Sequence, residues 1–97
     1  MPTYILLVSW THKGIENVKE SPSRLDAAKR AFQAVGAQLK EFYLVMGQYD
    51  MVVIAEAPDD ETAAKLALTI GSAGAIRTET LRAFTEAEYR TIVASLP

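Results

Sequence analysis

The middle of the chain holds a turn signal between two apolar runs, and this arrangement predicts a β-hairpin. The runs cover residues 41–46 and 51–57, and Gly47 follows the first of them. Glycine adopts positive φ at no steric cost, which a short hairpin connection often requires. Pro58 stops the second run because proline donates no ladder hydrogen bond, and Asp59 is a good helix N-cap. We therefore expect the hairpin to lead directly into a helix.

Two further segments have the residue pattern of β-strands. Residues 3–9 are mostly apolar on both faces, which is typical of a strand that is covered on both sides. Residues 76–84 alternate regularly between two faces, and both faces carry charged residues. This half-polar pattern predicts a strand at the edge of a sheet.

Helical spacing predicts three helices. The first has Ser21 as its N-cap and ends at Gly36, because glycine readily takes the left-handed conformation that closes a helix. The second begins after Asp59 and ends at residues 71–74. Thr85 and Glu88 form a capping box that opens the last helix, and residues 15–19 allow one additional helical turn.

The predicted order is β-α-β-β-α-β followed by a C-terminal helix, in one domain that spans residues 1–97. The hairpin makes the second and third strands antiparallel neighbours, and right-handed crossovers place both main helices on one face of the sheet. The expected fold class is therefore α+β, with a ferredoxin-like arrangement around an antiparallel four-stranded sheet.

The other face of this sheet needs a cover. The third strand carries Val52 and Ile54 on one face and Met51 and Val53 on the other, so both faces are apolar. Each buried Val- or Ile-sized side chain is stabilised by about 1.5–3 kcal/mol relative to exposure. We expect a second copy to cover the open face and form a homodimer. The alternative is a monomer whose last helix folds over the sheet.

Composition excludes several classes of function. The chain has 97 residues, no cysteine and a formal charge of −2, with a calculated pI of about 5.3. It therefore has no thiolate chemistry, and it lacks the basic surface that binding to nucleic acid requires. It also has no run of about 20 apolar residues that would span a membrane, and no signal-peptide pattern. We expect a cytoplasmic protein that binds neither nucleic acid nor membrane.

Three stretches of the sequence are similar to those of the GYD-domain family. They are residues 47–60, which begin Gly-Gln-Tyr-Asp, residues 10–15 (Trp-Thr-His-Lys-Gly-Ile) and residues 74–84. Ala75 departs from the family, which often has asparagine there. The resemblance implies a homo-oligomeric bacterial or archaeal protein that forms a dimeric α/β-barrel of ferredoxin-like subunits. It implies no particular reaction, although related barrels include haem-degrading and quinone-forming monooxygenases.

Glu56 is the first candidate for chemistry because it follows an otherwise apolar strand. Burying an unpaired carboxylate is costly, and a carboxylate in such surroundings suits a general acid or base. The structural alternative is an ion pair with Arg77 or Arg82, or a cap on the next helix. Asp50 lies on the same strand face as Glu56 but about 20 Å away, which is too far for a catalytic carboxylate pair.

The remaining candidates lie at turns. Tyr49 and Asp50 either line the mouth of a cleft or stabilise the hairpin turn, which both residue types favour. His12, the only histidine, is either a proton carrier beside Trp10 or a solvated loop residue. Five aromatic residues either line an apolar cleft or belong to the core or a dimer interface: Tyr4, Trp10, Phe42, Tyr43 and Tyr49. We predict no metal site and no cofactor.

Three functions are compatible with these observations. The first is binding of a small organic ligand in the barrel cleft, near Trp10, His12, Tyr49, Asp50 and Glu56. The second is a cofactor-free or haem-dependent monooxygenase or isomerase in which His12 or Glu56 moves protons. The third is a regulatory module that senses a metabolite at a subunit interface. Whether the chain is an enzyme stays open at this point.

Overall fold

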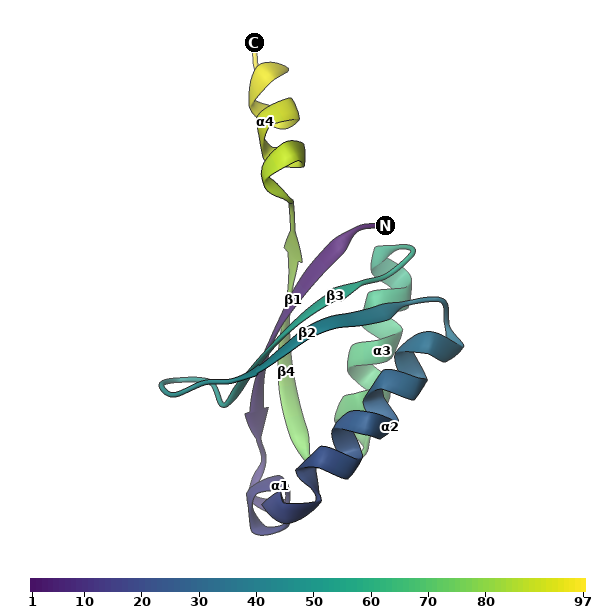
Figure 1. The fold of residues 1–97 in the computed structure, drawn as a ribbon, viewed down its shortest axis with the longest axis vertical. Coiled ribbons are helices and arrows are strands. Elements are labelled where there is room, and N and C mark those ends of the chain that lie inside the picture. The colour runs from purple at the N-terminus through teal and green to yellow at the C-terminus, as the bar shows by residue number, and fades with distance from the viewer.

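The computed structural model describes all 97 residues, and its elements follow the predicted order (Figure 1). The strands and helices have the following bounds: β1 (Thr3–Trp10), α1 (His12–Glu16), a 3₁₀ turn (Val18–Glu20), α2 (Ser21–Ala34), β2 (Gln38–Leu44), β3 (Met51–Glu56), α3 (Asp60–Ser72), β4 (Ile76–Ala83) and α4 (Glu86–Ala94).

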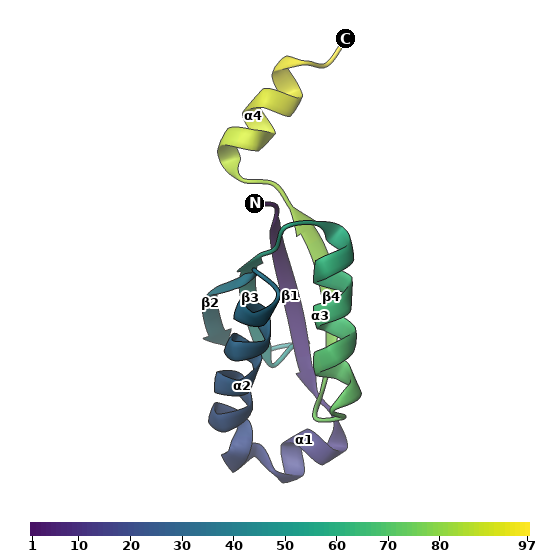
Figure 2. The same cartoon turned by 90° about the vertical axis from the view of Figure 1, so that its right-hand side faces the viewer.

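The four strands form one sheet in the order β2-β3-β1-β4, and every neighbouring pair is antiparallel. This order is that of a ferredoxin-like α+β fold, as the sequence predicts. β4 lies at an edge, in agreement with its half-polar alternation. In the view of Figure 2, α2 and α3 both lie in front of the sheet, so they cover the same face.

The core lies between the sheet and these two helices. β1 contributes three alternate side chains to it and β3 contributes three more, because one face of each strand turns toward the helices. Phe32 from α2 and Leu66 from α3 pack against them. The six strand residues are Tyr4, Leu6, Val8, Met51, Val53 and Ala55.

The caps and turns of the central region confirm most of the local predictions. Asp59 accepts a hydrogen bond from the backbone N–H of Thr62 at 2.8 Å and caps α3. Thr85 and Glu88 form the predicted capping box at the start of α4. Gly36 and Gly47 have φ angles of 77° and 131°, which non-glycine residues rarely adopt.

Two boundary predictions are wrong. The predicted strand 41–46 is instead β2, Gln38–Leu44, whose register with β3 ends at the pair Leu44 and Met51. Beyond that pair the N–H of Val45 still donates to the carbonyl oxygen of Asp50 at 2.9 Å, inside the hairpin connection. Ser21 is not the N-cap of α2. It already has helical angles (φ −56°, ψ −42°), because the 3₁₀ turn runs straight into the helix.

The helical turn predicted at residues 15–19 is also displaced. α1 begins three residues earlier, at His12, because Thr11 caps it by accepting a hydrogen bond from the N–H of Gly14 at 3.1 Å. Only the 3₁₀ turn follows it before α2 begins.

α4 lies beyond the sheet. In both Figure 1 and Figure 2 it projects past the end of β4, away from the other elements, and the molecule measures 51 Å along its longest axis. The expected alternative of a monomer whose last helix folds over its own sheet is therefore not what the chain adopts. None of the helices has the length and hydropathy needed to cross a membrane.

Candidate binding surfaces

Asp50 connects the hairpin to the end of β1. Its Oδ2 accepts a hydrogen bond from the backbone N–H of Trp10 at 3.0 Å, and its own N–H donates to the carbonyl oxygen of Val8 at 2.9 Å. A carboxylate that accepts from a backbone N–H makes a charge-assisted hydrogen bond, which is stronger than a neutral one. Asp50 therefore has a structural role at the turn, which was one of the two predicted alternatives.

Tyr49 lies beside Asp50 but contacts a different strand. Its hydroxyl donates to Oε2 of Glu79 on β4 at 2.6 Å, and this hydrogen bond raises the pKa of the Tyr49 phenol. Glu79 is paired in register with Leu7, whose side chain lies on the sheet face that the helices do not cover. Tyr49 thus ties the hairpin to the rim of the open face.

Glu56 and His12 each contact another polar side chain at the surface. Glu56 lies 4.0 Å from the amine of Lys40, whereas the ion-pair alternative drawn from the sequence named Arg77 or Arg82 as the partner. His12 lies 3.1 Å from Glu16 within α1, and its side chain is 87% exposed. A surface ion pair such as that of Glu56 and Lys40 contributes about 0–1 kcal/mol to stability.

The five predicted ligand-binding residues do not meet at one place in the chain. Trp10 packs against the core on the helix side of the sheet, whereas Glu56 lies on the open side, at the end of β3 opposite to Asp50. The indole N–H of Trp10 is buried and has no hydrogen-bond partner. Ligand binding by Trp10, His12, Tyr49, Asp50 and Glu56 remains a prediction. No group of three or more potential metal ligands is present.

The open sheet face has an apolar centre and a charged rim. Its central residues come from three adjacent strands, because residues paired in register point to the same side. Leu81 on β4 is 42% exposed, and Tyr43 on the other edge strand is 54% exposed. The central residues are Ile5, Leu7, Val52, Ile54 and Leu81.

A second apolar surface is the cleft between α2 and α3. It has a volume of about 300 Å³, and 15 of its 19 lining residues are hydrophobic. Its floor is formed by Leu6, Val8 and Met51 from the sheet. Its walls carry several small residues, namely Ala27, Ala28 and Ala31 on α2 and Ala73 after α3.

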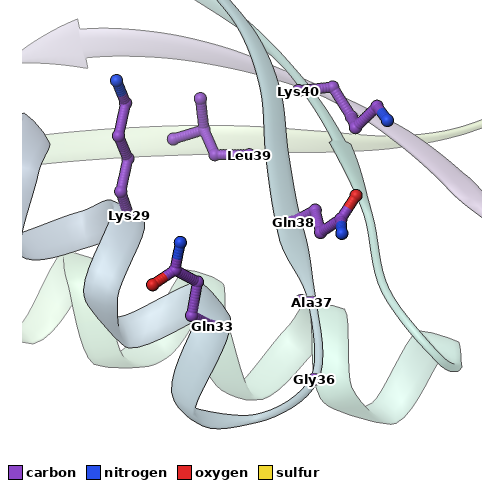
Figure 3. A pocket seen from close by; sticks show the side chains of 7 residues that line it. All are labelled: Lys29, Gln33, Gly36, Ala37, Gln38, Leu39 and Lys40. Atoms are coloured by element: carbon purple, nitrogen blue, oxygen red, sulfur yellow. The ribbon is translucent and has the colours of Figure 1, made fainter.

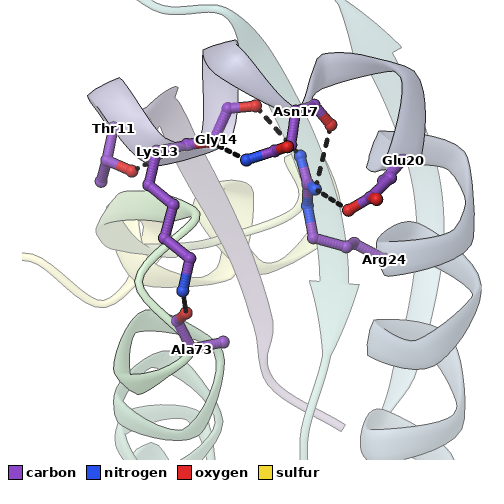
Figure 4. A network of polar contacts seen from close by, with 7 residues as sticks. All are labelled: Thr11, Lys13, Gly14, Asn17, Glu20, Arg24 and Ala73. Carbon is purple, nitrogen blue, oxygen red and sulfur yellow. Dashed lines mark hydrogen bonds and ion pairs between the residues drawn. The ribbon is translucent and has the colours of Figure 1, made fainter.

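Polar contacts close the end of this cleft that lies nearest α1 (Figure 4). Arg24 donates to the carbonyl oxygens of Gly14 and Asn17, each at 3.2 Å, and pairs with Glu20 at 3.7 Å. Lys13 reaches the carbonyl oxygen of Ala73 at 3.4 Å. Arg24 is the one charged residue in the lining, and its charge is already paired. The cleft therefore suits an uncharged apolar occupant.

A larger and more polar hollow lies between the C-terminal half of α2 and β2. It has a volume of about 530 Å³, and two lysines belong to its lining. Figure 3 shows the side chain of Leu39 on the same side of β2 as Lys29, whereas Lys40 points to the other side. The two amines do not converge, so they do not form an anion site.

Comparison with known proteins identifies the family. The sequence model of the GYD-domain family matches residues 4–93 of this chain. This chain belongs to the GYD-domain family. The hairpin turn with Tyr49 and Asp50 is thus part of a GYD domain in which Asp50 ties the turn to β1.

One relative of this GYD chain is a curated protein of Thermus thermophilus named glutamine synthetase and cystathionine beta-lyase binding protein. The two are 34% identical over 89 residues, which cover 91% of this chain and 94% of that protein.

Solved structures support the same fold. TTHA0845 from Thermus thermophilus is 29% identical, with a TM-score of 0.57 over 88% of this chain and 95% of that one. The leucine response regulatory protein LrpA of Mycobacterium tuberculosis has a TM-score of 0.66 at 13% identity, over 87% of this chain and 51% of that chain. The second likeness shows the fold alone.

The sequence of the GYD chain predicts, as one alternative, an apolar cleft lined by five aromatic residues, and of these only Phe42 lines the α2–α3 cleft. The helical stripes did contain a signal, because alanine occupies several inward positions of α2 and leaves space above the sheet. Periodicity marks which helix face points inward, but it does not reveal how far apart two helices lie.

Proposed function

We propose that this GYD-domain chain is a protein-binding module that acts as a homodimer and binds a metabolic enzyme of the glutamine synthetase or cystathionine β-lyase class. The observation that carries the proposal is the relative named for binding these two enzymes, whose match extends over nearly the full length of both chains. The exposed apolar surfaces support it, since contiguous apolar patches commonly mark interaction sites.

The open sheet face is the basis for self-association. Ile5, Leu7 and Ile54 form its centre, and no element of the chain covers them. A second copy placed sheet against sheet would bury both apolar centres in one isologous interface, the kind that two-fold dimers use. This arrangement would make the dimeric barrel that the family resemblance implies.

Enzyme binding is tested with glutamine synthetase and cystathionine β-lyase from the organism that encodes the chain. Each enzyme is immobilised, and binding of the purified chain is followed by biolayer interferometry, with an unrelated oligomeric enzyme as the control surface. We expect saturable binding to at least one of the two enzymes. Binding to neither, or equal binding to the control enzyme, would refute the proposed partner class.

Dimerisation is tested separately by Ile54→Lys, which places a charge at the centre of the open face. Leu68→Lys is the matched control, because Leu68 lies on α3 and is 74% exposed. Sedimentation equilibrium should show a dimer for the wild type and for Leu68→Lys, and a monomer for Ile54→Lys. A wild-type monomer at concentrations of about 100 μM would rule out a stable sheet-to-sheet dimer.

Binding of a small organic ligand is the second candidate. The observation in its favour is the buried indole N–H of Trp10, which has no acceptor and to which a ligand oxygen could provide one. Native mass spectrometry of freshly purified protein, followed by denaturation, tests it. A released small molecule of defined mass would support this candidate, and a ligand-free protein would remove its basis.

A further inference from the structure

We infer that α4 of one chain packs into the cleft between α2 and α3 of a second copy of this chain. The inference concerns a different surface from the open sheet face, and it goes beyond the proposed binding of an enzyme. It rests on two apolar surfaces that the fold leaves without a partner.

The first surface is the apolar stripe of α4. The four residues follow the spacing i, i+3, i+4 and i+7, which is the anchor pattern of helices that dock in apolar grooves. Three of them lie on one side of α4, and the fourth, Leu96, follows directly after its C-cap Ser95. Their exposed fractions are 60, 44, 46 and 65%, so their own chain leaves them largely uncovered. The stripe consists of Tyr89, Ile92, Val93 and Leu96.

α4 also needs external contacts to persist. It has nine residues, whereas isolated helices shorter than about 12–15 residues are marginal in water. The capping box satisfies its first N–H groups but supplies no packing. No other element of the chain packs substantially against this helix. Contacts from another molecule are therefore required to hold it.

The second surface is the apolar cleft itself. Two helices that lie side by side with small residues between them form a groove that receives the side chains of a third helix. Ala27 and Ala28 on α2 and Ala73 after α3 keep this groove open. With about 300 Å³ and no unpaired charge, it has room for a few aliphatic or aromatic side chains.

The two surfaces cannot meet within one chain. α4 follows the C-terminal end of β4, whereas Ser21, Arg24 and Ile76 line the cleft toward the other end of the sheet, near α1. Figures 1 and 2 both show α4 and α1 at opposite ends of the molecule, which is 51 Å long. In an assembly of two copies, α4 of one copy can reach the cleft of the other.

Charge favours the same pairing. The first turn of α4 carries Glu88 and Glu86, the latter paired with Arg90 of the same helix, whereas Arg30 lies on the exposed surface of α2, one turn from Ala27 of the cleft. Opposite charges at the rim of an interface select the partner and its orientation more than they add affinity. Each copy carries one α4 stripe and one cleft, so every stripe in an assembly of identical copies has one cleft to bind.

The absence of cysteine makes a direct test possible. One protein carries Val93→Cys on the stripe, and a second carries Ala27→Cys at the cleft, where residue 27 is exposed on α2. The two are mixed with oxidised glutathione. We expect a mixed disulfide between them, because bridged residues need Cα atoms within about 7 Å of each other.

Thr91→Cys is the matched control, because Thr91 lies on the opposite side of α4. We expect it to form the disulfide with Ala27→Cys at least about tenfold more slowly than Val93→Cys does. Equal rates would overturn the inference, as would a product linking only Val93→Cys to itself. Circular dichroism and melting curves establish that each variant keeps the wild-type fold.

The same pair in an Ile54→Lys background separates this contact from the sheet-to-sheet dimer. The mixed disulfide should persist when the sheet dimer is lost, and its loss would show that α4 has no interface of its own. A missing disulfide together with a co-purified small molecule would assign the cleft to a ligand and overturn the inference.

Discussion

The carboxylate of Asp50 accepts a hydrogen bond from the backbone N–H of Trp10 at 3.0 Å, and this contact joins the central hairpin to the end of β1. Forty residues separate the two positions in the chain. The Asp of the Gly-Gln-Tyr-Asp stretch thus has a defined structural task, independent of any catalytic role. Its substitution should reduce the stability of the sheet.

We predict that Asp50→Ala lowers the free energy of unfolding by about 1.5–3 kcal/mol, because hydrogen bonds to charged groups contribute this much and the N–H of Trp10 loses its acceptor. Urea denaturation followed by Trp10 fluorescence measures the change. Asp50→Asn keeps an acceptor oxygen and should lose less. Equal losses for Ala and Asn would mean that the acceptor is not what stabilises the turn.

The close contact between α1 and the start of β4 predicts opposite effects for two glycine substitutions. A Cβ atom on Gly14 would clash with the carbonyl group of Ala75, so Gly14→Ala must displace α1 and destabilise the fold. Gly71 lies within α3 with no atom close to an added Cβ. Gly71→Ala should therefore stabilise by about 0.5–1 kcal/mol.

Thermal melting of both glycine variants tests this pair. The melting temperature should fall for Gly14→Ala and rise for Gly71→Ala. A Gly14→Ala protein that melts like the wild type would show that α1 can move away from Ala75 without cost.

The N-cap of α3 predicts a loss of stability in acid. The hydrogen bond from the backbone N–H of Thr62 holds the pKa of Asp59 below its ordinary value of 3.8. Because the pKa is lowered in the folded state, this stabilisation is complete above pH 3.8 and decreases as the pH falls through the folded-state value. Urea denaturation at a series of pH values from neutral downward measures it.

Asp59→Asn is the control for the acid effect. Asparagine still caps a helix but does not ionise in this range, so the variant should lose less stability between neutral and acid pH than the wild type. Parallel curves for the two proteins would exclude a contribution from the Asp59 cap.

Tyr4 predicts a loss of stability in alkali. Burial, followed by its hydrogen bond to Asp60 at 2.5 Å, raises the pKa of Tyr4 from 10.0 to about 12. The folded state favours the neutral phenol, so this stabilisation is complete below pH 10 and is lost as the pH rises toward 12. Absorbance of phenolate should show one tyrosine that ionises after the others.

Tyr4→Phe should remove that late ionisation and flatten the alkaline decrease in stability. Tyr49→Phe is the comparison, because the pKa of Tyr49 is also raised but its side chain lies outside the core. If Tyr49→Phe alone removed the late step, the ionisation would belong to the hairpin rather than to the core.

The sequence predicted where several candidate residues lie along the chain, but it did not predict which residues they contact in the fold. Tyr49 and Asp50 were expected at a turn, and both lie there. For Glu56 the sequence leaves open a general acid or base and a structural role, either an ion pair with Arg77 or Arg82 or a helix cap. In the structure Glu56 pairs with Lys40, because register places β2 beside β3 at that end of the sheet. Which cation faces a carboxylate depends on strand register, and local spacing does not specify it.

The sequence by itself determined the order of the elements, the hairpin at Gly47, the caps at Asp59 and Thr85, and the edge position of β4. These features depend on residues that lie within a few positions of one another, so their physical causes are local. Only the tertiary structure decided the separation of α2 and α3, the direction of α4 and which face of each strand turns toward the helices. These features depend on how segments distant in the sequence pack, and that packing is determined jointly by side-chain volumes and strand register.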